Sequence, residues 1–296
     1  MDKEYELDLF LQTLINGILI GGILICLTIG FQLTFGVLHV IDFAVGGWTM
    51  LGGYTAYWLV TLAGIDPFIS IFLVFALFLL IGRGLGPLIY RVRTSRYARP
   101  DLMALAFTFG IFLFMRGGAL WLWSYNSRSV ESVLSGQFLS LGPVTIPLLR
   151  LSAFIMAVLF SLGLFILLYR SRFGMAVRAL AQNRDHAGLM GVDVKRISAW
   201  VYGIYTGLTA SAGVLIATIY SVNPTVGIRY TLFAFFVAVL AGLGSVGGVL
   251  VAGLALGLLE AYVATYIGAR YSLLIVFGTL YLALLVAPKG VLGRGI

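Results

Sequence analysis

The sequence predicts an all-α polytopic bundle of membrane-spanning helices, with eight to nine spans in a single transmembrane domain over residues 1–296. Three observations predict this fold class: 61% of the 296 residues are hydrophobic, only 10% are charged, and the mean hydropathy is +1.06. A soluble domain carries about 25% charged residues. Because a span needs roughly 20 residues, the chain has room for no sizeable soluble domain, which excludes a water-soluble enzyme.

Nine apolar runs follow one another along the chain. The first run, at about 22 residues, follows an acidic start and is longer than the core of a secretory signal, so we expect a span there. The seventh run is short and flanked by glycine, so it is either a full crossing or a re-entrant or tilted segment. The expected spans are residues 9–31, 36–61, 67–90, 101–123, 147–169, 197–220, 229–244, 248–267 and 271–287.

The charges between the runs predict the orientation. Loop 91–100 carries four arginines and no acid, and segment 170–196 carries six basic residues against two acidic ones. Because basic loops are retained in the cytoplasm, both are expected there. Nine crossings then place the N-terminus outside, the C-terminal tail with Lys289 and Arg294 in the cytoplasm, and loop 124–146 outside as an interfacial cap.

Residue types disfavour several functional classes. Each lysine is followed by Glu, Arg or Gly, so no Gly-rich loop ending in Lys-Ser or Lys-Thr is present to bind ATP. Two histidines and the single Cys26, far apart in sequence, do not suit a metal site. The net charge of +8 comes from loop arginines that set topology, so we expect no nucleic-acid partner. We expect no catalytic residue, no cofactor and no metal in this chain.

The 37 glycines favour closely packed helices, because small residues let helix backbones approach each other in lipid. Residues 43–47 and 246–250 share a spacing of small residues. Glycine-rich membrane helices produce such matches by chance, so the sequence leaves an internal duplication open.

Four ionisable residues lie inside the expected spans, where each costs several kcal/mol unless it is paired, hydrated or snorkelling. They are Asp42, Arg83, Arg116 and Glu260. At 1.5 Å per residue, Asp42 and Arg83 lie about 10 Å from the cytoplasmic ends, and Glu260 and Arg116 about 18 and 22 Å. We therefore expect two couples, Asp42 with Arg83 and Glu260 with Arg116. The alternative is that both arginines snorkel to an interface.

Asp42 lies in a stretch, residues 38–47, where a polar residue precedes a glycine pair. Such a composition is typical of a kinked or broken helix whose freed backbone groups line a cavity. We assign Asp42, Phe43, Gly46 and Gly47 to a substrate pathway, with Glu260, Arg116 and Arg83. The alternative for Asp42 is a structural role in which it caps the break.

Segment 170–196 is expected to form one or two short helices lying off the membrane. Ala176, Leu180, Ala187 and Met190 give part of an apolar stripe, and small residues keep one face thin. A thin face allows insertion into a groove of a partner. The alternative is a solvated loop whose arginines only set topology.

Four stretches in this order, residues 35–54, 173–194, 240–248 and 288–293, resemble the LivH/LivM-type permeases of ABC importers for branched-chain amino acids. The stretch from Phe173 to Val194 resembles the coupling loop of these permeases. The resemblance implies that Arg178, Ala179, Gln182, Ala187 and Gly191 meet an ATPase. Gly191 suits a turn at a helix end, and Ala187 leaves room for a partner surface.

The resemblance implies one subunit of a larger machine in a bacterial or archaeal inner membrane. Its partners would be membrane lipid, a second homologous permease, an external solute-binding protein and two cytoplasmic ATPases, which would bind the ATP and Mg. Transport would proceed by alternating access, driven by movement of segment 170–196. The competing hypothesis is a stand-alone secondary transporter or channel, in which Asp42 and Glu260 carry protons or ions.

One departure from the family pattern bears on the substrate. Where LivH-type sequences usually read Asn-Phe-Ala-His-Gly, this chain reads Asp42-Phe-Ala-Val-Gly46. The wider family carries branched-chain and other amino acids, urea, short amides and small organic acids. A carboxylate facing the pathway would suit a substrate with an ammonium group or several N–H donors.

Overall fold

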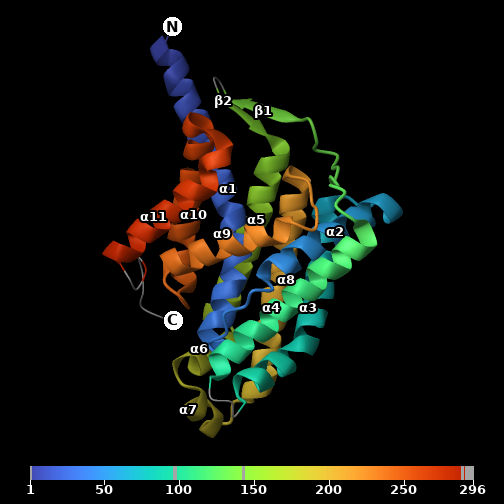
Figure 1. The fold of residues 1–296 in the computed structure, drawn as a ribbon, viewed down its shortest axis with the longest axis vertical. Helices are drawn as coiled ribbons and strands as arrows, with labels where there is room; N and C mark the ends of the chain where they lie inside the picture. Colours follow the sequence, from blue (N-terminus) through green and yellow to red (C-terminus); the bar gives the residue numbers. More distant parts are fainter. Residues whose placement is uncertain (1, 96–98, 142–143, 288–289, 291–296) are drawn as a thin grey trace.

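The computed structural model describes residues 2–95, 99–141, 144–287 and 290, which form a helical bundle with one β-hairpin (Figure 1). Arg96 and the C-terminal stretch 288–293, apart from Gly290, lie outside the described residues, as does Arg294. The α-helices are α1 (Asp2–Leu38), α2 (Val45–Ala63), α3 (Pro67–Arg93), α4 (Pro100–Trp123), α5 (Leu148–Arg170), α6 (Arg172–Gln182), α7 (Arg184–Leu189), α8 (Val194–Ile219), α9 (Val226–Ala241), α10 (Val246–Val263) and α11 (Ser272–Val286).

Within the described part, the nine apolar runs correspond to α1 to α5 and α8 to α11. Six stretches are long and apolar enough to cross a membrane by length and composition. One of them is the 41-residue stretch Val246–Val286, in which a π-helical turn (Ala264–Gly268) and a 3-10 turn (Ala269–Tyr271) join α10 to α11. The seventh run is the 16-residue α9, short as expected.

A β-hairpin is the exception to the all-α prediction. Strand β1 (Phe138–Leu141) pairs antiparallel with β2 (Val144–Pro147) inside the expected loop 124–146. The side-chain amide of Gln12 donates to the carbonyl of Thr145 (2.8 Å) and accepts from its N–H (3.0 Å). The hairpin therefore lies beside the start of α1, at the end of the bundle opposite α6 and α7 (Figure 1). We call these two ends the hairpin end and the α7 end.

The expected continuous span 36–61 is wrong, and the expected helix break is confirmed. Helix α1 continues to Leu38, residues 39–44 are not helical, and α2 begins at Val45. His39 has a positive φ of 52°, which stops the right-handed helix. The Asp42 carboxylate then accepts the N–H of Ala44 (2.7 Å), a local bond that competes with helix formation.

The same device recurs between α8 and α9. Asn223 Oδ1 accepts the N–H of Thr225 (2.9 Å), and Asn223-Pro-Thr-Val-Gly227 repeats the polar-x-x-Val-Gly pattern of residues 42–46. Helix α1 ends at the α7 end and α8 begins there, so the two helices run in opposite directions (Figure 1). Helix α1 packs mainly on α10, and α8 mainly on α3. The structure thus contains an inverted repeat, whose second copy lies at residues 223–227 rather than 246–250.

Candidate functional site

The two half-helices α2 and α9 meet at their N-termini, and we call residues 42–47 and 223–231 the half-helix junction. A Cβ on Gly46 would overlap the carbonyl oxygen of Gly227. The Gly46 N–H donates to Thr231 Oγ1 (3.2 Å), whose hydroxyl donates to the Gly227 carbonyl (2.8 Å). A Cβ on Gly47 would lie 2.7 Å from the Met115 sulfur of α4. Only glycine permits this approach of two backbones.

Asp42 is fully buried at the junction, with 0% of its surface exposed. Its Oδ1 accepts the Ala44 N–H (2.7 Å), and its Oδ2 accepts the hydroxyl of Tyr202 on α8 (2.8 Å). Both carboxylate oxygens therefore have donors inside the chain. Asp42 thus bonds within the helix break, whereas the N-cap position of α2 is Ala44, and a role of Asp42 in the substrate pathway stays a prediction.

Phe43 lies between α4 and α9, next to Asp42. Its backbone N–H donates to Thr108 Oγ1 (3.2 Å). Its ring centroid is 4.9 Å from that of Phe235 and 5.9 Å from that of Phe109. The half-buried ring therefore packs against α4 on one side and against α9 on the other.

The expected couple of Asp42 with Arg83 is wrong. Arg83 is exposed on α3, and its guanidinium lies 4.2 Å from the ring centroid of Trp200 on α8. The cation is thus held by an aromatic face, whereas Asp42 takes a neutral donor, Tyr202. Arg83 therefore lies outside the half-helix junction.

The expected couple of Glu260 with Arg116 is also wrong. Glu260 on α10 pairs with Arg229 on α9 at 2.9 Å, and their side chains are 13% and 49% exposed. Arg229 stands at the edge of the expected seventh span, which is why it was not counted among the intramembrane charges. Arg116 is half-buried on α4, and its Nε has no hydrogen-bond partner among the described residues.

The Arg229–Glu260 pair lies beside further polar groups near the hairpin end. A cavity of about 20 Å³ is lined by this pair together with Arg150 and Tyr220. Arg150 also donates to Asn16 Oδ1 (3.1 Å). A space of this size holds about one water molecule, so it offers no room for a larger solute in this conformation.

Segment 170–196 forms two short helices, α6 and α7, as expected. Ser171 Oγ accepts the N–H of Gly174 (2.9 Å) and begins α6. Asn183 Oδ1 accepts the N–H of His186 (3.0 Å) and begins α7, and Asp193 Oδ1 accepts the N–H of Arg196 (3.0 Å) and begins α8. Three N-cap side chains therefore define the helix boundaries of this segment.

The five expected coupling residues differ in accessibility. Arg178 turns back to α5, where it donates to the carbonyl of Leu168, Ala179 is half-buried and Gln182 is exposed. Ala187 is buried within the chain, so the expectation that it leaves room for a partner surface is wrong. Gly191 has a positive φ of 84° and turns the chain after α7, as expected.

Two residues at the end of α7 were missed as a pair. Leu189 and Met190 are 84% and 86% exposed, although both are apolar. Met190 belonged to the expected stripe, but the adjacent Leu189 did not. The adjacent pair of large apolar residues, Leu189 and Met190, between polar residues and glycines is the sequence signal for this exposed tip.

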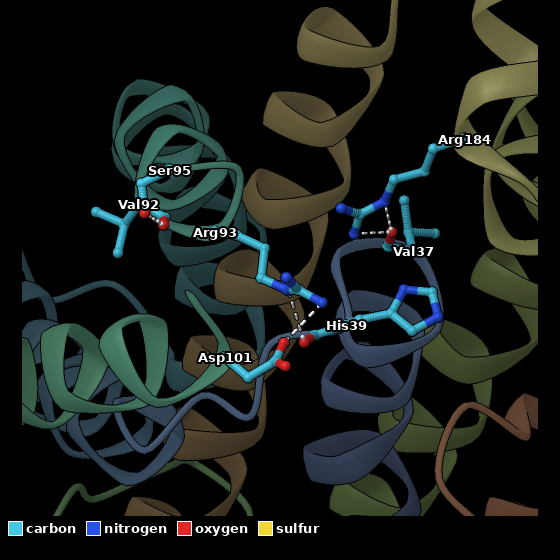
Figure 2. A network of polar contacts seen from close by, with 7 residues as sticks. All are labelled: Val37, His39, Val92, Arg93, Ser95, Asp101 and Arg184. Atoms are coloured by element: carbon cyan, nitrogen blue, oxygen red, sulfur yellow. Dashed lines mark hydrogen bonds and ion pairs between the residues drawn. The ribbon is translucent and has the colours of Figure 1, made fainter. Parts of the chain in front are cut away.

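A polar network joins α7 to the end of α1 (Figure 2). Arg184 donates from Nη2 (2.6 Å) and Nε (3.1 Å) to the carbonyl oxygen of Val37. Arg93 of α3 donates to the carbonyl of His39 (3.3 Å) and pairs with Asp101 of α4 at 2.6 Å. Arginine side chains thus satisfy carbonyls that a helix end leaves open.

Burial and the nearby Arg184 and Arg93 lower the pKa of His39, which lies just beyond α1. The neutral imidazole is therefore favoured in the fold. His39 lies directly after α1 and three residues before Asp42.

The bundle, with its long apolar helices and its two broken helices, defines a multi-pass membrane transport protein. A family model for branched-chain amino acid transport system permease components matches residues 13–284. The chain belongs to this family.

Relatives match over nearly the whole chain. The permease protein BraD of a high-affinity branched-chain amino acid transport system in Pseudomonas aeruginosa is 32% identical, over 98% of this chain and 97% of its own length. The permease protein LivH of Salmonella typhimurium is also 32% identical, over 96% of each chain. The ribose import permease RbsC of Escherichia coli is 27% identical over 80% of this chain and 68% of its own. No solved structure matches the chain.

Proposed function

We propose that this chain is a permease subunit of an ATP-driven importer for branched-chain amino acids or related small solutes such as urea and amides. The observation that carries the proposal is the contact between α7 and the broken helix. Arg184 holds the Val37 carbonyl, and the half-helix junction begins five residues later, at Asp42. A push on α7 therefore reaches the junction through one short segment.

The partners we propose are a second homologous permease, two ATPases that bind ATP and Mg, and an external solute-binding protein. The exposed Leu189 and Met190 suit insertion into an apolar groove of an ATPase. We place the α7 end in the cytoplasm of a bacterial or archaeal inner membrane, because segment 170–196 is rich in arginine and lysine. The hairpin end, with the N-terminus, then faces outside, and the C-terminal tail lies in the cytoplasm.

The half-helix junction is the proposed hinge of alternating access. Gly46 and Gly227 touch through backbone atoms, and we propose that α2 and α9 move relative to each other at this contact. Asp42 has both oxygens occupied within the chain, so its charge is held by donors of the protein in this conformation. We propose that Phe43, Gly46 and Gly47 border the pathway, and that Glu260 with Arg229 borders its hairpin end.

The test is transport by the assembled complex in proteoliposomes. The tagged chain is purified together with its partners, and uptake of radiolabelled leucine, urea and acetamide is measured with ATP or with a non-hydrolysable analogue. We expect uptake of one of these solutes only with ATP and only when the solute-binding protein is present. Uptake by the chain alone without ATP would support a stand-alone secondary transporter and would overturn the proposal.

A further inference from the structure

Two hollows lie along α3 and α8 on the surface of the bundle, and we call them together the groove. Its apolar part has a volume of about 650 Å³ and is lined by Phe75, Leu79, Phe160 and Trp200, among other apolar side chains. An adjoining hollow of about 400 Å³ is lined by Arg83, among other residues. The two spaces share the same two helices, α3 and α8.

The spacing along each helix places the linings of the two spaces on one face of α3 and one face of α8. Residues three or four apart lie on one face of a helix. On α3 the lining residues are Phe72, Phe75, Leu79, Arg83 and Pro87. On α8 they are Leu208, Ile204 and Trp200 in the apolar space, and Ala199, Arg196 and Lys195 in the other space. Each stripe is apolar toward the hairpin end and basic toward the α7 end.

Arg83 and Trp200 mark the boundary between the apolar and the basic parts. The guanidinium of Arg83 lies 4.2 Å from the Trp200 ring centroid, and Trp residues are enriched where a helix meets the membrane interface. The cation is held in place by the ring and remains exposed. The Arg83–Trp200 pair therefore separates the apolar part of the groove from its basic part.

The basic part carries more positive than negative charge. Arg83, Lys195 and Arg196 line it with a single acid, Asp193. Asp193 accepts the N–H of Arg196 as the N-cap of α8, and neither ion pair found among the described residues involves the three cations. An anion at this position would meet three cations against the single carboxylate of Asp193.

We propose that this groove binds an anionic phospholipid, with its phosphate at Arg83, Lys195 and Arg196 and an acyl chain between α3 and α5. The order of the surfaces matches the order of the groups in such a lipid, a negative headgroup followed by hydrocarbon. Each nearby cation strengthens the binding of an anionic headgroup by about fivefold. A lipid with a neutral headgroup would gain only the contacts of its acyl chain with the apolar part of the groove.

The binding is tested by native mass spectrometry of the full chain in detergent. The probes are phosphatidylglycerol and phosphatidylcholine with identical acyl chains, and glycerol phosphate as a headgroup without chains. We expect phosphatidylglycerol to remain bound at concentrations where phosphatidylcholine is lost, and glycerol phosphate not to displace it. Equal retention of the two lipids would overturn the proposal, and so would equally strong binding of glycerol phosphate, which would indicate a site for free phosphate.

Two pairs of variants separate the headgroup from the acyl chain. Arg83→Gln with Arg196→Gln is expected to weaken phosphatidylglycerol binding about fivefold per arginine, whereas Arg99→Gln with Arg270→Gln, two exposed arginines elsewhere, leaves it unchanged. Gly163→Leu fills the groove, because a Cβ there meets open space. Its matched control is Gly110→Leu on α4, where a Cβ also meets open space.

We expect Gly163→Leu to reduce retention of phosphatidylglycerol at least several-fold, and Gly110→Leu to have no effect. Unchanged retention in Gly163→Leu would overturn the acyl-chain part of the proposal. If instead the chain forms a dimer that Gly163→Leu dissociates, and neither lipid is retained, the groove is a protein interface and the lipid proposal is wrong. Both readouts are measured without transport, so they are independent of the proposed function.

Discussion

Arg184 donates both of its hydrogen bonds in this network to a single acceptor, the carbonyl oxygen of Val37. The donor belongs to α7, and the acceptor lies in the last turn of α1. A charged donor to a helix-end carbonyl is worth about 1.5–3 kcal/mol. The contact therefore ties the proposed coupling helix to the helix that breaks before Asp42.

Arg184→Gln is expected to uncouple transport from ATP hydrolysis. Glutamine is shorter and uncharged, so α7 would move without carrying the end of α1. In the reconstituted complex we expect solute uptake to fall by about tenfold, the equivalent of about 1.4 kcal/mol, while ATP hydrolysis continues. The control is Arg172→Gln, which removes an exposed arginine from α6. Wild-type uptake in Arg184→Gln would contradict the coupling role.

Gly46→Ala is expected to destabilise the fold. Its methyl group would overlap the Gly227 carbonyl, and overpacking of this kind costs about 1–3 kcal/mol. Gly110→Ala, in open space on α4, is the matched control, and it should be neutral or slightly stabilising because alanine favours helix. Thermal unfolding of the purified chain measures both. Equal midpoints for the two variants would show that the junction tolerates a side chain.

Asp42→Asn and Asp42→Ala are expected to differ. Asparagine keeps an oxygen for the Ala44 N–H and an amide that can pair with the Tyr202 hydroxyl, whereas alanine leaves both buried groups without a partner, at about 1–3 kcal/mol each. We expect Asp42→Asn to retain transport and Asp42→Ala to lower the unfolding midpoint clearly. Loss of transport in a well-folded Asp42→Asn would favour a proton-carrying carboxylate and the secondary-transporter mechanism.

A double-mutant cycle tests the ion pair of Glu260 with Arg229. Arg229→Gln leaves the largely buried Glu260 carboxylate without its partner and should be destabilising, whereas Glu260→Gln leaves a half-exposed arginine and should cost less. The double variant should be less destabilised than the sum of the two. We expect a coupling energy of about 0.5–3 kcal/mol. The same cycle with Arg116→Gln should be additive within about 0.5 kcal/mol. If Glu260 and Arg229 were additive while Glu260 and Arg116 were coupled, Glu260 would pair with Arg116, as the sequence predicted, and not with Arg229.

The pKa of His39 predicts a pH effect. Burial, Arg184 and Arg93 lower this pKa in the fold, so the folded chain binds fewer protons than the unfolded chain, and the stability that follows is present above about pH 6.5 and is lost as the pH falls through the lowered value. His39→Asn keeps a residue that tolerates a positive φ. We expect the unfolding midpoint of the wild type to drop more than that of His39→Asn between pH 7 and pH 5. Parallel pH profiles would exclude His39 as the source.

The apolar helices and the break at Asp42 were predictable because both depend on local sequence. A run of apolar residues fixes a long helix, and a polar residue before a glycine pair fixes its interruption. The partners of the ionisable residues were not predictable, because pairing depends on the rotation of each helix about its axis. Depth along the membrane matched Asp42 with Arg83, yet the two side chains have different surroundings.

The sequence did not predict the hairpin, and it left the duplication open with its second copy at residues 246–250 instead of 223–227. Strands Phe138–Leu141 and Val144–Pro147 form a ladder of only four residue pairs, too short to give a clear alternation in the sequence. The repeat is carried by a polar residue, a valine and a glycine, which is too little to identify without knowing that both copies begin a half-helix. Among the proposed coupling residues, Arg184 was missed because its acceptor is a backbone carbonyl, which has no residue type to match.

The contact of Gly46 with Gly227 has a consequence for how the chain can change over time. Main-chain atoms meet there. A larger residue at Gly46 therefore cannot be compensated by a smaller residue at Gly227, because Gly227 already has no side chain. Each of the two positions must therefore remain glycine on its own account, although the two residues are in contact. We expect related sequences to vary freely around this point of contact while the two glycines persist independently of each other, without correlated substitution.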